Sequence, residues 1–179
     1  VQDSAANNGA ADSQLVTIDT TAPTPVVIPT DDPLNPPAGK ASITVNDVTA
    51  DNIVNTTEGA SSSVAVTGTV RGEFKTGDVV TLTINNKIFT GTAAANGTFS
   101  INVPGSDLLA DSDKTVAASV AATDVAGNVG AVTGTKLYSV DTAAPTTAVD
   151  ITAISTDSGT AGDFITNDNN GLTISATLS

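Results

Sequence analysis

Apolar and polar residues alternate along most of this chain with a period of two, the pattern of strands that bury one face. Val80, Leu82 and Ile84 alternate with two threonines, and similar alternation continues from Phe99 and from Val116. The pattern predicts strands, each with one buried face, at 42–47, 64–71, 78–85, 87–93, 98–103, 115–123 and 131–140.

Short turns separate these predicted strands. Asn85-Asn86 and Asn96-Gly97 lie between strand segments, where tight turns need the positive φ that Asn and Gly adopt at low cost. Helix is predicted only as a single turn at 106–110. About seven strands in one unit of this size predict an all-β fold, an immunoglobulin-like β-sandwich. The sequence lacks the cysteine pair and the tryptophan of antibody domains, so only the architecture is implied.

The start of the chain resembles residues 122–146. A D-x-A-x-N-x-G pattern begins at Asp3 and again at Asp124, and a D-T-x-A-P pattern begins at Asp19 and again at Asp141. Self-similarity at a fixed spacing is typical of tandem repeats. The sequence opens within such a pattern, so we expect a fragment of a longer protein.

A second, weaker similarity joins residues 51–55 to 163–167 and residues 64–70 to 172–178. The chain is therefore predicted to contain the end of one repeat, one whole repeat and the beginning of another. The flanking pieces are too short to bury a core, so we expect packing on neighbours to order them. The predicted parts are the C-terminal hairpin of a preceding repeat at 1–22, a proline-rich linker at 23–40, a complete domain at 41–141 and the N-terminal part of a following repeat at 142–179.

Composition removes several classes of protein. Nineteen acidic residues against six basic ones give a net charge of −13, which leaves no basic surface for phosphates and argues against nucleic-acid binding. The sequence has no Cys, His, Met or Trp. Thiolate and imidazole metal sites, histidine-dependent nucleophiles and disulfides are thereby excluded. No apolar run approaches the length of a spanning helix, so membrane insertion is not expected.

The stretch GDVVTLTINNKIFTGTAAANGTFSINVPGSDLLADSDKTVAASVAATDVAGNVG (77–130), followed by YSVDTAAPT (138–146), resembles the bacterial immunoglobulin-like repeats of giant RTX adhesins. The order of VPGSDL, TDVAGN and VDTAAPT carries this resemblance. It implies a secreted rod on the bacterial cell surface, whose tandem repeats contact their neighbours in the same chain. It also implies that Ca²⁺ stiffens the junctions and that other domains of the parent protein contact the ligand.

Composition favours the same cation, because Asp and two Glu supply hard oxygen ligands and no soft ligand competes. In an immunoglobulin-like sandwich the loop after the first strand lies where the chain leaves, and the last hairpin loop lies where it enters. The acidic pair Asp31-Asp32 is also expected near the entrance. The predicted Ca²⁺ ligands are Asp51, Asn52, Asn55, Glu58 and Asp141 at the exit, and Asp19, Asp124 and Asn128 at the entrance.

These motifs also have explanations without a metal. Asp, Gly and Asn favour turns, so residues 124–128 can be a turn alone and residues 141–145 a strand exit alone. Asp107, Asp111 and Asp113 share one loop, for which a solvated loop is favoured over a cation site. Paired carboxylates can hydrolyse glycosides, but a sugar site also needs aromatic platforms and a cleft. The five aromatic residues are scattered, so we expect no enzyme.

The leading functional interpretation is a structural extender that sets distance and stiffness between the cell and an adhesive tip. One alternative is a carbohydrate- or receptor-binding immunoglobulin-like module, and another is the immunoglobulin-like spacer of a secreted polysaccharide hydrolase. A binding module would need exposed aromatics or an elaborated loop. The predicted loops are short and poor in aromatics, which favours the extender.

Overall fold

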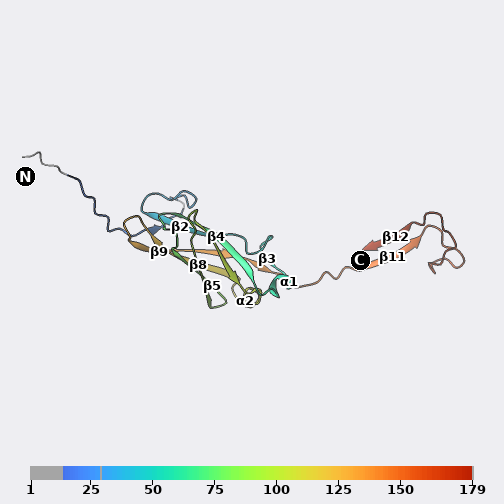
Figure 1. Cartoon of the computed structure of the whole chain (residues 1–179). Coiled ribbons are helices and arrows are strands. Elements are labelled where there is room, and N and C mark those ends of the chain that lie inside the picture. The colour runs from blue at the N-terminus through green and yellow to red at the C-terminus, as the bar shows by residue number, and fades with distance from the viewer. Residues whose placement is uncertain (1–13, 29, 179) are drawn as a thin grey trace, which may run out of the picture. The chain divides into compact units, whose positions relative to one another are not determined.

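The computed structural model describes residues 14–28 and 30–178. The chain divides into two compact units, of which unit 1 ends at Thr142 and unit 2 begins at Ala143 (Figure 1). The hairpin predicted at 1–22 lies largely outside the described residues, and residues 14–22 form neither helix nor strand. None of the helices within the described ranges is long and apolar enough to cross a membrane.

Unit 1 is a sandwich of two four-stranded sheets, with a short strand pair and two short helices at its loops. The first sheet has the order β1 (Thr24–Pro25), β2 (Lys40–Val45), β4 (Val64–Gly72), β7 (Thr98–Val103). The second has the order β6 (Lys87–Thr92), β5 (Val79–Ile84), β8 (Thr115–Thr123), β9 (Val129–Leu137). The remaining elements are the pair β3 (Ile53–Val54) with β10 (Ser139–Val140), and the helices α1 (Thr56–Gly59) and α2 (Gly105–Ala110). The predicted all-β sandwich is confirmed.

The core lies between the two sheets and follows the predicted alternation. In β5, Val80, Leu82 and Ile84 are buried while the intervening threonines lie on the outer face. In β8, Val116 and Val120 are buried in the same way. Burial of each such side chain contributes about 1.5–3 kcal/mol. The hairpin between β5 and β6 turns at Asn85-Asn86 with φ of 50° and 57°, as predicted.

The proline-rich stretch 23–40 contributes to the first sheet, although the sequence predicted a linker there. β1 pairs in parallel with β2: Thr24 N–H donates to Gly39 O at 3.0 Å and Val26 N–H to Ala41 O at 3.2 Å. Pro25 has no N–H to donate, and an edge strand tolerates this because its two neighbours donate instead. The domain boundaries themselves remain predictions.

Two glycines allow β9 to approach the first sheet closely. A Cβ atom on Gly130 would lie 1.8 Å from the carbonyl oxygen of Pro23, and one on Gly134 would lie 2.5 Å from that of Ile43. No side chain fits in either place, because real Cβ contacts are much longer. Gly130 therefore lets the entering chain lie directly against the second sheet.

The single strand predicted at 131–140 is divided at Tyr138, which corrects that prediction. The buried Tyr138 donates its N–H to Lys114 O at 3.0 Å and its hydroxyl to Leu108 O at 2.8 Å. Beyond it, β10 changes partner and pairs in parallel with β3. There Ser139 N–H donates to Asn52 O at 3.0 Å, which holds the leaving chain against the loop after β2.

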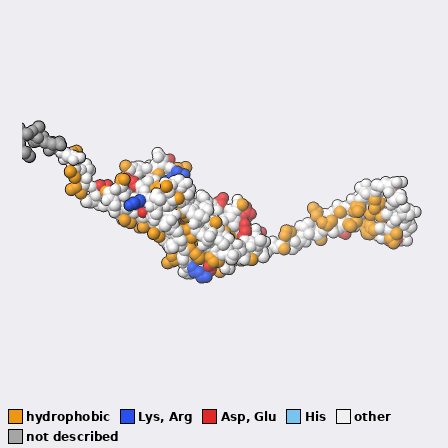
Figure 2. All heavy atoms as spheres, in the orientation of Figure 1, with side chains coloured by type: hydrophobic (Ala, Val, Ile, Leu, Met, Phe, Trp, Pro, Cys, Tyr) orange, Lys and Arg blue, Asp and Glu red, His pale blue; other side chains and the backbone are white. Residues whose placement is uncertain are grey.

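Unit 2 consists mainly of one antiparallel hairpin of β11 (Val149–Ile154) and β12 (Ile174–Leu178). Leu178 pairs with Val149 in this hairpin, and Val70, which corresponds to Leu178 by sequence, pairs with Ile43 between β2 and β4. The β11–β12 pairing also has a register shift between Ile151 and Ala153, whereas the β2–β4 pairing is continuous. Ile43 and Val70 are buried in unit 1, whereas most apolar side chains of the unit 2 hairpin are exposed (Figure 2).

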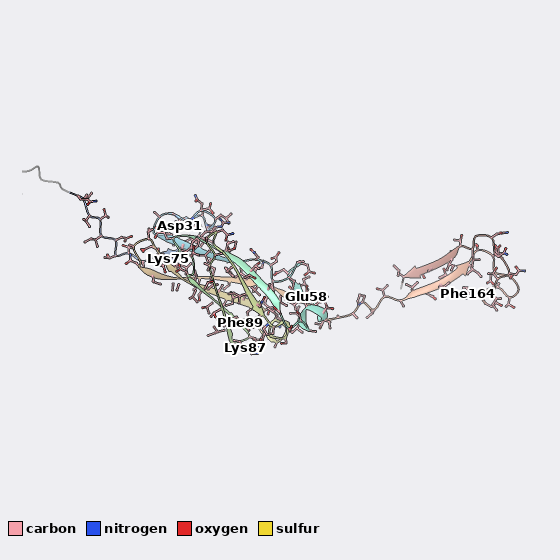
Figure 3. The ribbon with its side chains drawn as sticks, viewed as in Figure 1. Asp31, Glu58, Lys75, Lys87, Phe89 and Phe164 are labelled. Atoms are coloured by element: carbon pink, nitrogen blue, oxygen red, sulfur yellow. The ribbon has the colours of Figure 1, made fainter. Side chains whose placement is uncertain are left out.

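The loops of the two units share a backbone feature as well. Asn52 has a φ of 60° and the corresponding Phe164 has a φ of 57°, an unusual conformation for a bulky residue (Figure 3). Asp51 Oδ1 accepts from Ile53 N–H at 3.0 Å, and Asp163 Oδ1 accepts from the residue two places later at the same distance. The loop geometry of unit 1 thus recurs in unit 2.

Candidate functional site

The turn between β8 and β9 holds two of the predicted entrance ligands. The Asp124 carboxylate, only 5% exposed, accepts from the backbone N–H and from Nδ2 of Asn128, both at 2.8 Å. The Asn128 amide lowers the pKa of the Asp124 carboxyl most, while loss of solvent acts in the opposite direction. Such bonds stabilise the ionised form. Asp124 is therefore a carboxylate that fixes the orientation of Asn128.

Asn128 also contacts the chain that enters unit 1. Its Nδ2 lies 3.3 Å from the carbonyl oxygen of Asp19 and 3.5 Å from that of Thr21. The Asp19 carboxylate instead accepts from Thr21 N–H at 2.9 Å. The structure thus brings Asp19, Asp124 and Asn128 together, with Asp19 contributing its main chain.

The acidic pair expected near the entrance is engaged within its own loop. Asp31 accepts from Val27 N–H at 2.7 Å and forms an ion pair with Lys40, and Val27 lowers the pKa of this carboxyl most. Asp32 accepts from Leu34 N–H at 2.8 Å. Both carboxylates therefore stabilise the loop between β1 and β2.

At the opposite end of unit 1, Asp51 and Asn52 form the loop after β2. Asp51 accepts from Ile53 N–H and from the Thr49 hydroxyl, both at 3.0 Å, and the Ile53 bond lowers the pKa of this carboxyl most. Asn52 donates from Nδ2 to Leu137 O at 2.9 Å. Asp51 therefore stabilises the loop itself, and Asn52 connects the loop to the end of β9.

Asn55 and Glu58, also predicted as ligands, form the capping box of α1. Asn55 Oδ1 accepts from Glu58 N–H, and Glu58 Oε2 accepts from Asn55 N–H, both at 3.0 Å. Asp141 lies beside this helix, where its N–H donates to Val54 O at 3.1 Å. Glu58 and Asp31 lie at opposite ends of unit 1 (Figure 3). The exit residues are neighbours, and the side chains of Asp51, Asn52, Asn55 and Glu58 make hydrogen bonds within or beside their own loops.

The entrance brings three acceptor oxygens around one point. Within the described ranges, no three Asp or Glu side chains come together in a way that could hold a metal. At the entrance, Asp124 Oδ2 and the carbonyl oxygens of Asp19 and Thr21 surround one amide group. All three are hard oxygen ligands, and water can complete the six to eight ligands that Ca²⁺ takes.

Three other aspartates have structural roles that the sequence did not predict. Asp78 joins the start of β5 to the end of β8, because it accepts from the N–H and the hydroxyl of Thr123 at 2.7 and 2.8 Å. Asp107 and Asp111 are buried, so the predicted solvated loop is wrong for them. Asp107 pairs with Lys87 at 2.6 Å, and this partner lowers the pKa of the carboxyl most. The spacing of these aspartates along the sequence gave no signal for contacts with residues far away in the chain.

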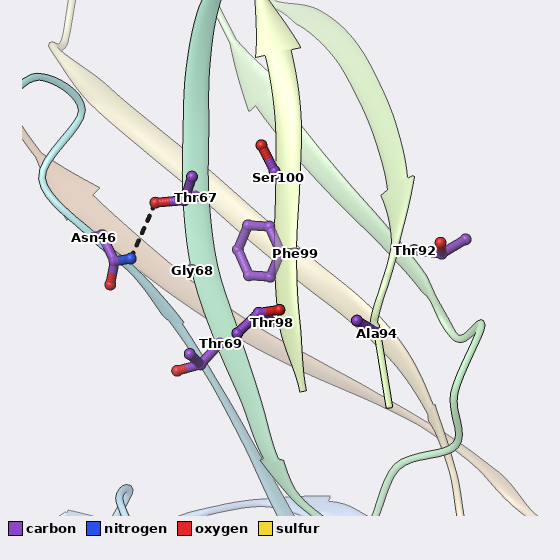
Figure 4. Close-up of a pocket in the computed structure, with 9 residues that line it drawn as sticks. All are labelled: Asn46, Thr67, Gly68, Thr69, Thr92, Ala94, Thr98, Phe99 and Ser100. Carbon is purple, nitrogen blue, oxygen red and sulfur yellow. Dashed lines mark hydrogen bonds between the residues drawn. The ribbon is translucent and has the colours of Figure 1, made fainter. Parts of the chain in front are cut away.

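A hollow of about 500 Å³ is lined by β4 and β7 of the first sheet and by residues at the end of β6 (Figure 4). Hydroxyls of Thr67, Thr69 and Ser100 line it, and Asn46 Nδ2 donates to the Thr67 hydroxyl at 3.0 Å. Phe99 is the aromatic residue of this lining, and it is only 4% exposed. The hollow therefore offers no aromatic platform on which a sugar ring could stack.

One solved structure decides the family. It is a bacterial immunoglobulin-like domain from the ice-binding adhesin of M. primoryensis, with 44% sequence identity and a TM-score of 0.52. The match covers 56% of this chain and 96% of that domain. The chain belongs to the bacterial immunoglobulin-like domains. The predicted family and the immunoglobulin-like form of the sandwich are thereby confirmed.

Two larger structures are similar to this bacterial immunoglobulin-like chain at 43% identity. One concerns host cell surface retention of a 1.5-MDa bacterial ice-binding adhesin, with a TM-score of 0.53 over 57% of this chain and 32% of that one. The other is a Ca²⁺-stabilized adhesin that helps an Antarctic bacterium reach out and bind ice, with a TM-score of 0.56 over 64% and 27%. This chain thus spans about a third or less of these larger relatives. No protein-family model and no curated protein matches it.

Proposed function

We propose that this chain is part of the extender region of a secreted bacterial cell-surface adhesin. The observation that carries the proposal is the 44% identity to an immunoglobulin-like domain of an adhesin over nearly that whole domain. Unit 2 repeats part of the sequence of unit 1, with residues 172–178 resembling 64–70, and this supports a tandem array. The work of such a module is mechanical: it sets distance and stiffness, and it has no catalytic role.

The partners in this proposal are neighbouring repeats of the same chain, outside the cell. Other domains of the parent protein contact the ligand. A net charge of −13 keeps such an array soluble through mutual repulsion and makes it sensitive to divalent cations. The exposed apolar face of the β11–β12 hairpin is consistent with a repeat that further strands complete.

Ca²⁺ at the junctions is the second part of the proposal. Asp124 Oδ2, the carbonyl oxygens of Asp19 and Thr21, and the Asn128 side chain would hold the ion at the entrance. The same ion is proposed at the exit, where the predicted ligands are Asp51, Asn52, Asn55, Glu58 and Asp141. A relative with 43% identity is a Ca²⁺-stabilized adhesin, which supports this assignment.

A thermal melt in millimolar Ca²⁺ and in excess chelator tests the calcium proposal. An ion bound only by the native state adds RT ln(1 + [L]/Kd) to stability, so we expect a higher melting temperature with Ca²⁺. Asp124→Asn should lose the part of that increase that the entrance site supplies. Asp113→Asn removes the same charge from the loop before β8 and should keep it. An equal increase in both variants would contradict a site at the entrance.

A glycan- or receptor-binding module is the alternative function. Hydroxyl groups line the hollow beside β4 and β7, but its aromatic ring is covered. Specific and saturable binding of a glycan by this chain would favour the alternative. We expect none.

A further inference from the structure

We infer that the Asn128 side chain is a metal-independent latch for the entering linker, and that the same side chain turns over to become a ligand when Ca²⁺ binds. This inference rests on the proposed function, because it describes how the junction of an extender keeps its geometry. It adds a state without the ion, in which the linker is already held. Asn128 acts here as a positioning residue.

Three acceptor oxygens surround the NH₂ group of Asn128. Asn128 Nδ2 lies 2.8 Å from Asp124 Oδ2, 3.3 Å from Asp19 O and 3.5 Å from Thr21 O. An NH₂ group carries two donors and no acceptor. It can therefore bridge the turn and the linker by hydrogen bonds alone, without any cation.

Asp124 fixes the position of Asn128. Its buried carboxylate accepts from both the backbone N–H and Nδ2 of Asn128, and its own N–H donates to Asn128 O at 3.0 Å. Two of these bonds hold the main chain of Asn128 and one holds its side chain, so the residue loses little entropy when it binds the linker. The turn is thus organised before the linker arrives.

The contact between the entering linker and the rest of unit 1 continues beyond Thr21. Two residues beyond Thr21, the carbonyl of Pro23 lies against Gly130, where no Cβ atom would fit. The next residue, Thr24, donates its N–H to Gly39 O at 3.0 Å. The linker is therefore held at Asp19, Thr21, Pro23 and Thr24, and Asn128 provides the contacts nearest its start.

The partner that this surface recognises has the pattern D-T-x-A-P. That pattern begins at Asp19 on the linker held here and again at Asp141, where the chain leaves unit 1. The D-x-A-x-N-x-G pattern of the latch turn begins at Asp124 and also at Asp3. The turn of unit 1 receives the D-T-x-A-P segment that precedes it. Because both patterns occur twice in the sequence, we expect the same contact at other junctions.

Ca²⁺ changes the role of the amide and keeps the linker where it is. A cation among the same three oxygens cannot share the space with a donor NH₂ group, because all of its ligands must be acceptors. A half-turn of the amide about its terminal bond presents Oδ1 in place of Nδ2. Asn128 then becomes a fourth oxygen ligand, and the linker carbonyls remain in place.

Asn128→Asp separates the two states, because Asp keeps an oxygen ligand and loses the donor. We would measure hydrogen–deuterium exchange of the segment 19–26 in the full chain. In excess chelator, Asn128→Asp should exchange about tenfold faster than the unmodified chain, as expected for the loss of one or two hydrogen bonds. Asn102→Asp adds the same charge at an exposed position of β7 and should exchange like the unmodified chain.

Adding millimolar Ca²⁺ completes the experiment. Protection should return in Asn128→Asp and should not return in Asn128→Ala, which lacks both donor and ligand. Exchange in β5 reports whether each variant is folded. Equal protection of Asn128→Asp and the unmodified chain in chelator would overturn the latch. If Ca²⁺ protects no variant further, the calcium proposal and the turning amide fail, whereas the latch is still decided by the chelator comparison.

Discussion

At the residue scale, most of the described carboxylates act as hydrogen-bond acceptors for the main chain. Asp51 accepts from Ile53 and Asp124 from Asn128, and these bonds lower the pKa of both carboxyls. Sequence reasoning predicted both residues as ligands from the positions of their loops in the sandwich. For Asp124 it could not decide between a turn and a metal site, because the same oxygen serves either purpose and only the position of its neighbours distinguishes them.

Tyr138 should stabilise unit 1 through its hydroxyl. The hydroxyl donates to Leu108 O at 2.8 Å and lies 3.1 Å from Asp111 Oδ2. Tyr138→Phe keeps the ring and leaves these buried acceptors without their donor, so we expect a loss of about 1–2 kcal/mol in the free energy of unfolding. Urea denaturation measures this loss. An unchanged midpoint would show that the hydroxyl contributes nothing.

Stability should fall in acid because the carboxyl of Asp107 has a lowered pKa, chiefly through Lys87. A depressed pKa in the folded state stabilises the protein above the unfolded value near 4, and this contribution is lost as the pH falls through the folded pKa. Melting temperatures between pH 6 and pH 2 test this. Asp107→Asn should be less stable than the unmodified chain at pH 6 and should show a smaller fall, whereas parallel curves would contradict the assignment.

At the scale of elements, the sequence predicted the long strands and missed the short ones. Period-two alternation identified β5, β7 and β8, because one face of each is buried by the opposite sheet. β1, β3 and β10 have two residues each, too few for a period, and their partners are distant along the chain. The helix α1 did have a signal: the N-x-x-E spacing of Asn55 and Glu58 is a capping box.

The close approach of β9 to the entering chain should make Gly130 sensitive to substitution. Gly130→Ala places a methyl group against the carbonyl of Pro23, and such overpacking costs about 1–3 kcal/mol. Ala131→Ser, at the exposed next position of β9, should change stability by less than about 0.5 kcal/mol. Chemical denaturation compares the two. Similar midpoints for both variants would mean that β9 can shift to accommodate the methyl group without a cost in stability.

The capping box of α1 should be measurable in the absence of any metal. Asn55→Ala removes the acceptor for Glu58 N–H, and loss of such a cap costs about 1 kcal/mol. Thr57→Ala, within the same helix, leaves the box intact and should have a smaller effect. Thermal melts in excess chelator compare these variants. If Asn55→Ala lowers the melting temperature only when Ca²⁺ is present, Asn55 acts mainly as a metal ligand and not as a helix cap.

At the scale of the whole chain, the two units differ in what covers their apolar side chains. Strands of unit 1 bury theirs between two sheets, whereas Val149, Ile174 and Leu178 of unit 2 are at least half exposed. The sequence analysis expected flanking pieces too short to bury a core, and its assignment of 142–179 to a following repeat stays a prediction. It could not predict that the loop conformation of Asn52 recurs at Phe164, because propensity disfavours a positive φ for Phe.

Unit 2 should therefore open far more readily than unit 1. A two-stranded hairpin is marginally stable alone, so backbone amides of β11 and β12 should exchange with solvent much faster than those of β5 and β8. Hydrogen exchange followed by mass spectrometry measures all four strands in one sample. Equal protection in both units would indicate that unit 2 buries its apolar face in solution.

The parallel pairing of both terminal strands has a consequence for a chain under tension. The entering and leaving segments lie at opposite ends of unit 1 (Figure 1), and β1 and β10 each run beside a parallel partner. A pull on the two ends draws each terminal strand along its own length. The hydrogen bonds of Thr24 and Val26, like those of Ser139 and Asp141, are then loaded in shear and resist together, whereas a strand peeled sideways would lose them one by one.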